Sequence, residues 1–238
     1  MSIKLEVCVD DATGLAAAIA GGADRIELCA ALGVGGLTPA PGLIARAAKA
    51  PIPVYAMIRP RAGSFVFDPS DIDAMRRDIE AVRKAGLAGV VLGASLPGGA
   101  LDVATLALLL NDARGLGTTL HRAIDLAPDM AEAVEQAVAL GFERILTSGG
   151  ARTALLGLDT LATAFETAQD RIIIMPGSGI VPENAGELLS RLPITEIHAS
   201  CSAPAPGDPR SVAFGFEPAT SRRTSEAVVR AFKAKLAG

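Results

Sequence analysis

The sequences KLEVCV at residues 4–9 and DRIELC at residues 24–29 decide the fold. Both are short runs in which apolar and polar side chains alternate, and this alternation is typical of a β-strand. An Ala-rich stretch of helical composition separates them, and the same exchange of strand and helix repeats along the chain. Gly, Pro or Asp marks each exchange. We count eight units, which predicts a parallel sheet, because parallel strands need helical crossovers.

The strands are predicted at residues 4–9, 24–29, 54–59, 89–93, 118–122, 144–147, 171–175 and 196–200. An open doubly wound sheet buries both faces of its strands, and its strands are therefore apolar throughout. Here Glu6, Glu27, Arg59 and His121 lie within strands or at their ends. We therefore predict an α/β fold consisting of one (β/α)8 TIM-type barrel over residues 1–238, in which these side chains converge on one mouth.

Two segments outside the strands carry further expectations. The hydroxyl of Ser70 is placed to cap a helix over residues 71–85, which Gly86 would end. Residues 203–223 contain repeated Pro and Gly and predict a long irregular loop after strand eight, over the barrel mouth. Such a loop would be either a mobile lid or a disordered excursion. Residues 224–236 are predicted to form the closing eighth helix.

Composition excludes several classes of function. Aromatic residues make up 3% of the chain and the net charge is −4, so nucleic acid is not an expected partner. Three cysteines cannot form a disulfide framework, and they are expected to be free thiols. The first residues turn polar before a signal peptide could form, and the apolar runs are too short to cross a membrane. We expect a cytoplasmic protein.

The alternation along the first two strands turns Glu6 and Cys8, and likewise Glu27 and Cys29, into the barrel. Strands lie about 4.8 Å apart, so the two thiols are expected to be neighbours. A thiol pair is a soft ligand set for Cu(I), to which Met57 and Met175 could add thioether sulfur. Alternatively, these residues are core fillers.

Charged residues are predicted to surround the acids. Arg59 is the expected partner of the buried carboxylates, and together with Arg61 it could clamp an anion. His121, Arg122 and Asp125 follow strand five and supply an imidazole, a cation and a carboxylate at the mouth. The alternative interpretations are a structural ion-pair network for the arginines and acids, and an Arg122–Asp125 salt bridge beside a satisfied histidine.

Two late glycine-containing segments are candidate anion-binding loops. The first contains Ser148 and Gly149 and the second contains Gly177 and Gly179; each is expected to precede a helix directly and to offer backbone N–H groups to a phosphate. They are equally consistent with ordinary tight turns. His198 near the end of strand eight makes a two-histidine site conceivable, but the ligand spacings of a structural zinc site are absent.

The motifs together resemble the CutC family over nearly the whole chain. The resemblance is carried by LEVC at 5–8, GADRIELC at 22–29, GGLTP at 35–39, IRPR at 58–61, HRA at 121–123 with Asp125, and LTSG at 146–149. It implies a (β/α)8 barrel in the cytoplasm, a homo-oligomer, and Cu(I) bound at Cys8 and Cys29. Cys201, after strand eight, is a third thiol that departs from the family pattern.

Two functions follow. The first is copper homeostasis, with Cu(I) held by thiols at the barrel mouth and with no organic cofactor. The second is a TIM-barrel lyase, isomerase or hydrolase that acts on a small anionic substrate. In it Glu6 or Glu27 is the base, His121 is the acid or polarises a carbonyl, and the arginines bind the anion. Whether the protein is an enzyme stays open at this point.

Overall fold

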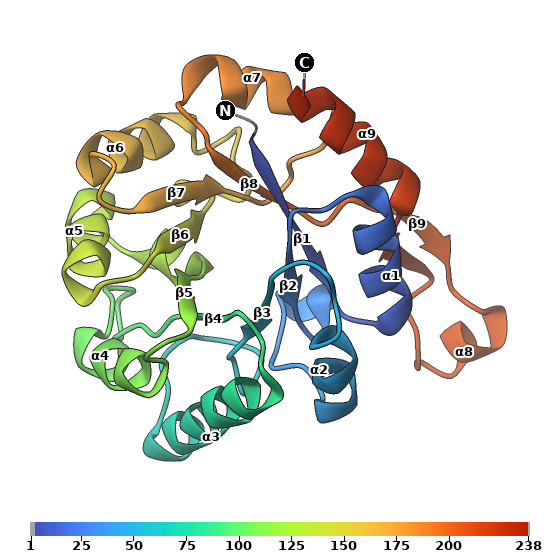
Figure 1. Cartoon of the computed structure of the whole chain (residues 1–238), viewed down its shortest axis with the longest axis horizontal. Coiled ribbons are helices and arrows are strands. Elements are labelled where there is room, and N and C mark those ends of the chain that lie inside the picture. The colour runs from blue at the N-terminus through green and yellow to red at the C-terminus, as the bar shows by residue number, and fades with distance from the viewer. Residues whose placement is uncertain (1–2, 238) are drawn as a thin grey trace.

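A computed structural model describes residues 3–237 of the chain, and in it eight parallel strands form a barrel that is nearly closed (Figure 1). Each strand pairs with its sequence neighbours, and β1 also pairs with β8. Among the described residues, β7 and β8 form no regular ladder. The predicted TIM-type barrel is therefore confirmed. Its strands are β1 (Lys4–Val9), β2 (Arg25–Leu28), β3 (Val54–Met57), β4 (Gly89–Leu92), β5 (Gly117–Leu120), β6 (Arg144–Thr147), β7 (Ile173–Pro176) and β8 (Glu196–Ala199).

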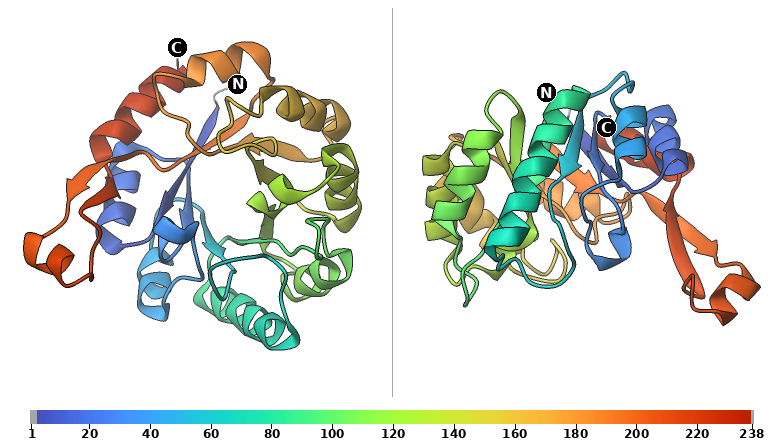
Figure 2. Two further views of the ribbon diagram at one scale, coloured as in Figure 1. Left: turned by 180° about the vertical axis from the view of Figure 1, so that it is seen from behind. Right: turned by 90° about the horizontal axis from the view of Figure 1, so that it is seen from below.

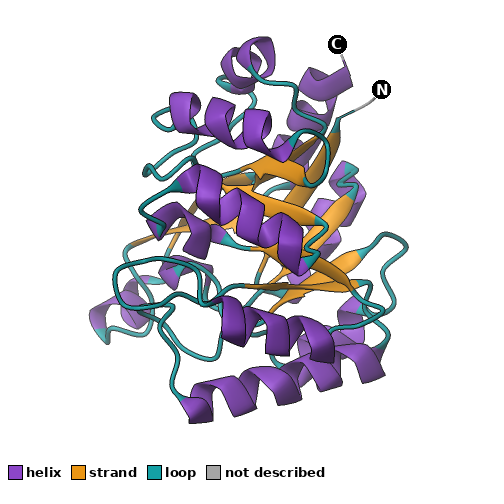
Figure 3. Ribbon diagram, turned by 90° about the vertical axis from the view of Figure 1, so that its left-hand side faces the viewer, coloured by secondary structure: helices purple, strands orange, loops and turns teal. Residues whose placement is uncertain are grey.

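The helices form an outer ring around the strands (Figures 1 and 3). The last helix packs against the first and confirms the predicted closing helix. None of the helices within residues 3–237 has the length and apolar character needed to cross a bilayer. The ring consists of α1 (Ala12–Gly21), α2 (Pro41–Ala47), α3 (Pro69–Ala85), α4 (Val103–Asp112), α5 (Met130–Leu140), α6 (Leu158–Ala168), α7 (Ala185–Arg191) and α9 (Glu226–Ala237).

Helix α3 begins two residues earlier than expected. Asp68, not Ser70, is its N-cap: the Asp68 carboxylate accepts from the backbone N–H groups of Ser70 and Asp71, and Asp71 completes a capping box. Pro69 occupies the first helical position, where its missing N–H costs nothing. The Ser70 hydroxyl instead donates to the same Asp68 oxygen, at 2.6 Å. The prediction of Ser70 as the cap was wrong because a stronger acceptor stands two residues before it.

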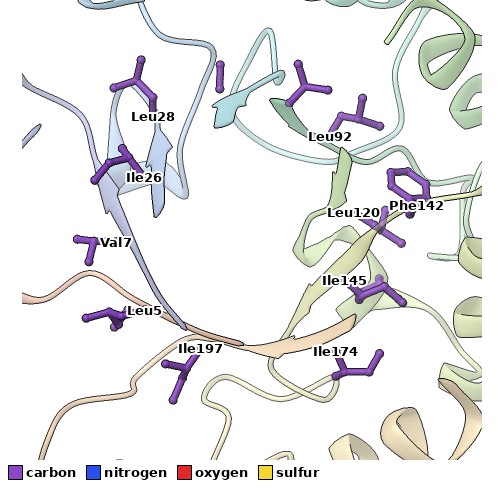
Figure 4. Close-up of a cluster of buried hydrophobic side chains, with 14 of the residues drawn as sticks. Leu5, Val7, Ile26, Leu28, Leu92, Leu120, Phe142, Ile145, Ile174 and Ile197 are labelled. Atoms are coloured by element: carbon purple, nitrogen blue, oxygen red, sulfur yellow. The ribbon is translucent and has the colours of Figure 1, made fainter. Parts of the chain in front are cut away.

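The core lies between the strands and the helices. Leu5, Val7, Ile26 and Leu28 point outward from β1 and β2, where each is fully buried (Figure 4). Their neighbours along the strands therefore point into the barrel, as the alternation predicts. Burying a side chain of this size stabilises the fold by about 1.5–3 kcal/mol. The outer face of the sheet supplies stability, and the inner face is free to carry polar groups.

The register of β1 and β2 differs from the level pairing that the two Glu-x-Cys sequences suggest. Cys8 lies opposite Glu27, and Glu6 lies opposite Arg25. On its other side, β1 places Glu6 opposite His198 of β8. Closing a barrel requires neighbouring strands to be staggered along one another, so equivalent sequence positions do not lie at one level. Cys8 consequently lies level with Glu27, and Cys29 lies two residues further along the chain.

The Pro-rich segment follows strand eight as expected, but it is regular. β9 (Ser202–Pro206) and β10 (Thr220–Thr224) form an antiparallel pair that encloses the short helix α8 (Pro209–Ala213). Prolines are tolerated in β9 because each strand of a two-stranded sheet has an unpaired edge. The hairpin extends away from the barrel and does not cover its mouth (Figure 2). The prediction of an irregular loop over the mouth was therefore wrong.

Gly117 of β5 has a specific packing requirement that makes it a test of the barrel interior. A Cβ atom there would lie 2.0 Å from the hydroxyl oxygen of Tyr55, so the ring occupies the space a side chain would need. We expect Gly117→Ala to lower the free energy of unfolding by about 1–3 kcal/mol in urea titrations. Gly42→Ala, at a helical site with no atom within 4 Å of the added carbon, is the control. Equal stability of the two variants would contradict this packing.

Candidate functional site at the barrel mouth

A cavity of about 470 Å³ opens at the ends of the strands. Its floor is polar, its walls are largely apolar, and Arg122 and Arg222 lie on its lining. Arg222 comes from β10, so the base of the hairpin reaches the cavity although its tip points away. The floor and wall residues include Cys8, Glu27, Leu32, Met57, Arg59, Phe65, His121, Leu146, Ile180, Val181 and His198.

Cys8, Glu27 and His198 form a cluster on the cavity floor. Each offers one ligand atom, these atoms lie within 4.8 Å of one another, and all three residues are buried. Within residues 3–237 this is the only such group of three potential metal ligands. The cluster depends on the barrel stagger, which sets Cys8 of β1 beside Glu27 of β2. We refer to these three residues as the floor cluster.

The floor cluster is electrostatically coupled through His198. Its Nδ1 lies 2.9 Å from a Glu6 oxygen, and its Nε2 lies 3.8 Å from a Glu27 oxygen. Burial alone would lower the pKa of His198, but Cys8, Glu27 and Glu6 raise it well above its usual value. Burial raises the pKa of Glu27, and the nearby Glu6 charge adds to this. The anionic neighbours of His198 thus favour its charged form, and the raised pKa of Glu27 makes its carboxylate a stronger base.

Glu6 lies beneath the cavity, and both of its oxygens are engaged. Arg25 donates to one and His198 contacts the other. Burial would raise the pKa of Glu6, but the charge of Arg25 and the His198 contact lower it to about 2. Glu6 is thus held as a carboxylate inside an ion-pair network. Of the two predicted candidates for the base, Glu6 and Glu27, only Glu27 lines the cavity.

Arg25 is the important residue that the sequence analysis missed. Its guanidinium donates to Glu6 and, at 2.6 Å, to Glu196 of β8. Arg25 lies two residues before Glu27, so the period of two that turns Glu27 inward also turns Arg25 inward. That signal was present in the sequence. The prediction that Arg59 is the partner of the buried acids was therefore wrong.

Arg59 binds backbone instead of carboxylates. It donates to the carbonyl oxygens of Val34, Gly36 and Gly63 at 2.8–3.0 Å, and its guanidinium lies 4.8 Å from the centre of the Phe65 ring. It thereby fixes the loops after β2 and β3 at the edge of the cavity. Arg61 points elsewhere and pairs with Asp71 at 2.8 Å. The structure does not bring the two arginines together as a clamp.

His121 lies in the cavity wall in a defined orientation. Its Nδ1 accepts a hydrogen bond from the backbone N–H of Ala123, at 3.2 Å, and its ring centre lies 4.8 Å from that of Phe65. Within the described chain, its buried Nε2 has no hydrogen-bond partner. Burial lowers the pKa of His121 to about 4, and the charge of Arg59 contributes in the same direction. The imidazole is therefore neutral at physiological pH.

Arg122 and Asp125 form a salt bridge with one another, which is the structural role that the sequence offered as the alternative to a catalytic one. Arg122 donates to Asp125 at 2.7 Å and to the Ser148 hydroxyl at 2.7 Å. Asp125 in turn accepts from the backbone N–H groups of Ser148 and Gly150. The Gly149 N–H donates to the Thr147 hydroxyl. The N–H groups of this loop are satisfied internally, so it offers no open cradle for an anion.

The second glycine loop lies closer to the cavity. Gly177 packs tightly, since an added Cβ would lie 2.5 Å from the Leu146 side chain, and its N–H donates to the carbonyl of Thr147. Gly179 lines the cavity. Helices α6 and α7 begin only at Leu158 and Ala185, so the expectation that each loop directly precedes a helix was wrong.

Neither of the two remaining thiols belongs to the floor cluster, although that of Cys29 contacts Glu27. The Cys29 thiol donates to a Glu27 oxygen at 3.6 Å, and burial together with the Glu27 charge raises its pKa well above the usual value. Met57 lines the cavity, whereas the Met175 sulfur accepts from Arg25 at 3.2 Å. Cys201 belongs to the outer core, and burial raises its pKa to about 12.

Comparison with known proteins gives one consistent result. The model of the CutC family matches residues 3–203. The family protein CutC of Rhizobium meliloti (strain 1021) is 61% identical over 98% of this chain and 96% of its own length. A crystal structure from Streptococcus agalactiae, described as "Putative Copper Homeostasis Protein CutC", is 32% identical with a TM-score of 0.79, over 83% of this chain and 98% of that one. A thiamine phosphate pyrophosphorylase from Pyrococcus furiosus, 15% identical over 99% of this chain and 96% of its own with a TM-score of 0.58, shares the fold.

Proposed function

Because this chain belongs to the CutC family, we propose that it binds Cu(I) at the floor cluster, with the Cys8 thiolate and the His198 imidazole as ligands. The observation that carries the proposal is the approach of the Cys8, Glu27 and His198 ligand atoms to within 4.8 Å of one another. Thiolate and imidazole both suit copper, whereas the Glu27 carboxylate is a harder ligand. The copper homeostasis role named for the Streptococcus relative supports this choice of metal.

The proposal gives Cys8 and Cys29 different roles, although resemblance implied an equal pair. Cys29 stands behind Glu27, and its raised pKa disfavours the thiolate that a metal needs. Cys8 lies beside the charged His198. Copper binding would release the His198 proton, because only the neutral ring is a ligand. Cys29 therefore contributes as a hydrogen-bond donor to Glu27 and not as a primary ligand.

A Cu(I) titration under reducing conditions, in competition with a colorimetric chelator, tests this assignment. We expect Cys8→Ser to weaken binding by more than about 100-fold, because loss of even an outer partner of a metal ligand costs about 10–100-fold. Cys201→Ser, at a buried thiol that lies outside the floor cluster, should weaken binding far less. Unchanged high-affinity binding in Cys8→Ser would contradict the site.

The cavity itself supports a second function, that of an enzyme acting on a small anionic substrate. Three buried polar atoms in residues that line it, Glu27 Oε1, Arg59 Nε and His121 Nε2, have no hydrogen-bond partner in the described chain. Buried polar atoms are rarely left unpaired, and leaving one so costs about 1–3 kcal/mol. The volume of 470 Å³ is also far larger than an ion needs and falls in the range of small-molecule sites. Glu27 is the base in this reading, with Arg122 and Arg222 near the anion.

Exchange of hydrogen on carbon tests the second function directly. Pyruvate is incubated with the protein in D2O containing a metal chelator, and deuterium entering its methyl group is followed by NMR. We expect exchange with the wild-type chain and its loss in Glu27→Gln. Exchange that is no faster than in buffer would refute proton abstraction from pyruvate by Glu27 and leave the copper proposal untouched.

A further inference from the structure

We propose that His121 is a fixed hydrogen-bond donor to a carbonyl or enolate oxygen, so that the cavity takes a small carbonyl compound such as a 2-keto acid. The inference deepens the second function proposed above and rests on it. It concerns a role for a residue outside the floor cluster and names the chemical group that the residue would recognise.

The hydrogen bond from Ala123 fixes which nitrogen of His121 carries the proton. The backbone N–H donates to Nδ1, so Nδ1 must present its lone pair. A neutral imidazole then carries its single proton on Nε2. His121 consequently offers an N–H group to the cavity and no free lone pair. This separates its role from that of His198, which belongs to the floor cluster.

The surroundings hold the imidazole still. The Phe65 ring packs against one side, and on another side a Cβ added to Gly93 would lie 2.4 Å from Nδ1. Gly93 thus leaves just enough room for the ring to approach the end of β4. A preorganised donor of this kind is effective because the protein need not reorganise when charge develops on the bound oxygen.

The unpaired N–H selects an oxygen acceptor in the ligand. His121 is only 3% exposed, and among residues 3–237 nothing accepts from its Nε2. The Phe65 ring that packs against His121 also contacts the Arg59 guanidinium, at 4.8 Å from the ring centre, so this wall of the cavity carries positive charge. Both features favour an oxygen on which negative charge accumulates. A carbonyl oxygen that becomes an enolate oxygen meets this description.

The chemistry balances without an oxidant or a further reactant. The carbon–hydrogen bond beside the carbonyl breaks, and its proton passes to the Glu27 carboxylate. Its electron pair forms the carbon–carbon double bond, while the electrons of the carbonyl π bond move to the oxygen that His121 contacts. Return of the proton, to the same carbon or to another, completes an exchange or an isomerisation.

Oxalate, a planar copy of the enolate of a 2-keto acid, is the probe. The chain has two histidines, which 15N-histidine NMR resolves. The set of signals that is lost in His121→Asn belongs to His121, and the set that remains belongs to His198. We expect the His121 proton on Nε2 at pH 7, a shift of that N–H when oxalate binds, and about tenfold weaker oxalate binding in His121→Asn. Circular dichroism checks the fold of His121→Asn, and His121→Phe, whose side chain has no donor, replaces it if His121→Asn does not fold.

Three results would overturn the proposal: a His121 proton on Nδ1, no oxalate binding, or oxalate binding equally well to wild type and His121→Asn. These results are independent of the pyruvate exchange experiment. If oxalate binds through His121 but no deuterium enters pyruvate, the donor stands and Glu27 is not a base for that substrate. If exchange occurs but is unchanged in His121→Asn, the enzyme stands and the role of His121 is refuted.

Discussion

Replacing Arg25 by methionine is expected to lower the free energy of unfolding by about 3–5 kcal/mol. Arg25 is buried between Glu6 and Glu196, and methionine fills similar space without a charge. The two carboxylates then remain buried, with His198 beside Glu6 and with Arg144 and Lys4 beside Glu196. The cost arises because an uncompensated buried charge is far more unfavourable than the ion pair was favourable. Urea unfolding followed by circular dichroism measures it, since the chain has no Trp.

The matched control is Arg77→Met on the surface of α3. Arg77 also pairs with a carboxylate, that of Asp73 at 2.8 Å, but both side chains are largely exposed. Exposed pairs contribute about 0–1 kcal/mol, so this variant should be nearly as stable as the wild type. Adding Glu6→Gln to Arg25→Met should restore part of the loss by removing one stranded charge. If Arg25→Met costs no more than Arg77→Met, the network does not hold the barrel together.

The second large effect is a loss of stability in mild acid caused by His121. Its pKa is about 4 in the folded protein, against 6.5 for an unperturbed histidine. Between these values the unfolded chain binds a proton and the folded chain does not, so stability falls as pH falls from 6.5 to about 4. The contribution is fully present above pH 6.5. Each unit of pKa difference corresponds to 1.36 kcal/mol, which gives a loss of about 3 kcal/mol.

The His121→Asn variant isolates this effect. Glu27 and His198, whose raised pKa values act in the opposite direction, are present in both proteins and largely cancel in the comparison. The difference in free energy of unfolding between wild type and variant should shrink by about 3 kcal/mol between pH 7.5 and pH 4. A difference that stays constant over this range would show that His121 titrates alike in the folded and unfolded chains.

The sequence was sufficient for the barrel and for the faces of its strands. Alternation within each strand depends only on the local backbone, so the order of residues alone predicts that Glu6, Cys8 and Glu27 turn inward. The partners across strands could not be found in this way. They depend on the stagger of the barrel, which is a property of the closed sheet and leaves no local pattern. Hence the pairing of Cys8 with Glu27 could not be predicted, whereas the inward direction of each could.

Two other errors have the same origin in non-local contacts. Arg59 was predicted to pair with the acids of the neighbouring strands, but its guanidinium donates instead to backbone carbonyl groups of two loops. Residues 202–224 contain prolines and glycines, which normally break regular structure. They nevertheless include two strands, β9 and β10, because these strands pair with one another in an antiparallel ladder. Pro204 in one strand is opposite Arg222 in the other.

Arg222 also gives the hairpin a consequence for the cavity. The floor cluster lies within residues 3–203, the stretch that the family model matches, whereas Arg222 belongs to β10, beyond that stretch. A change in the hairpin would therefore alter a charge on the cavity lining without altering the floor cluster.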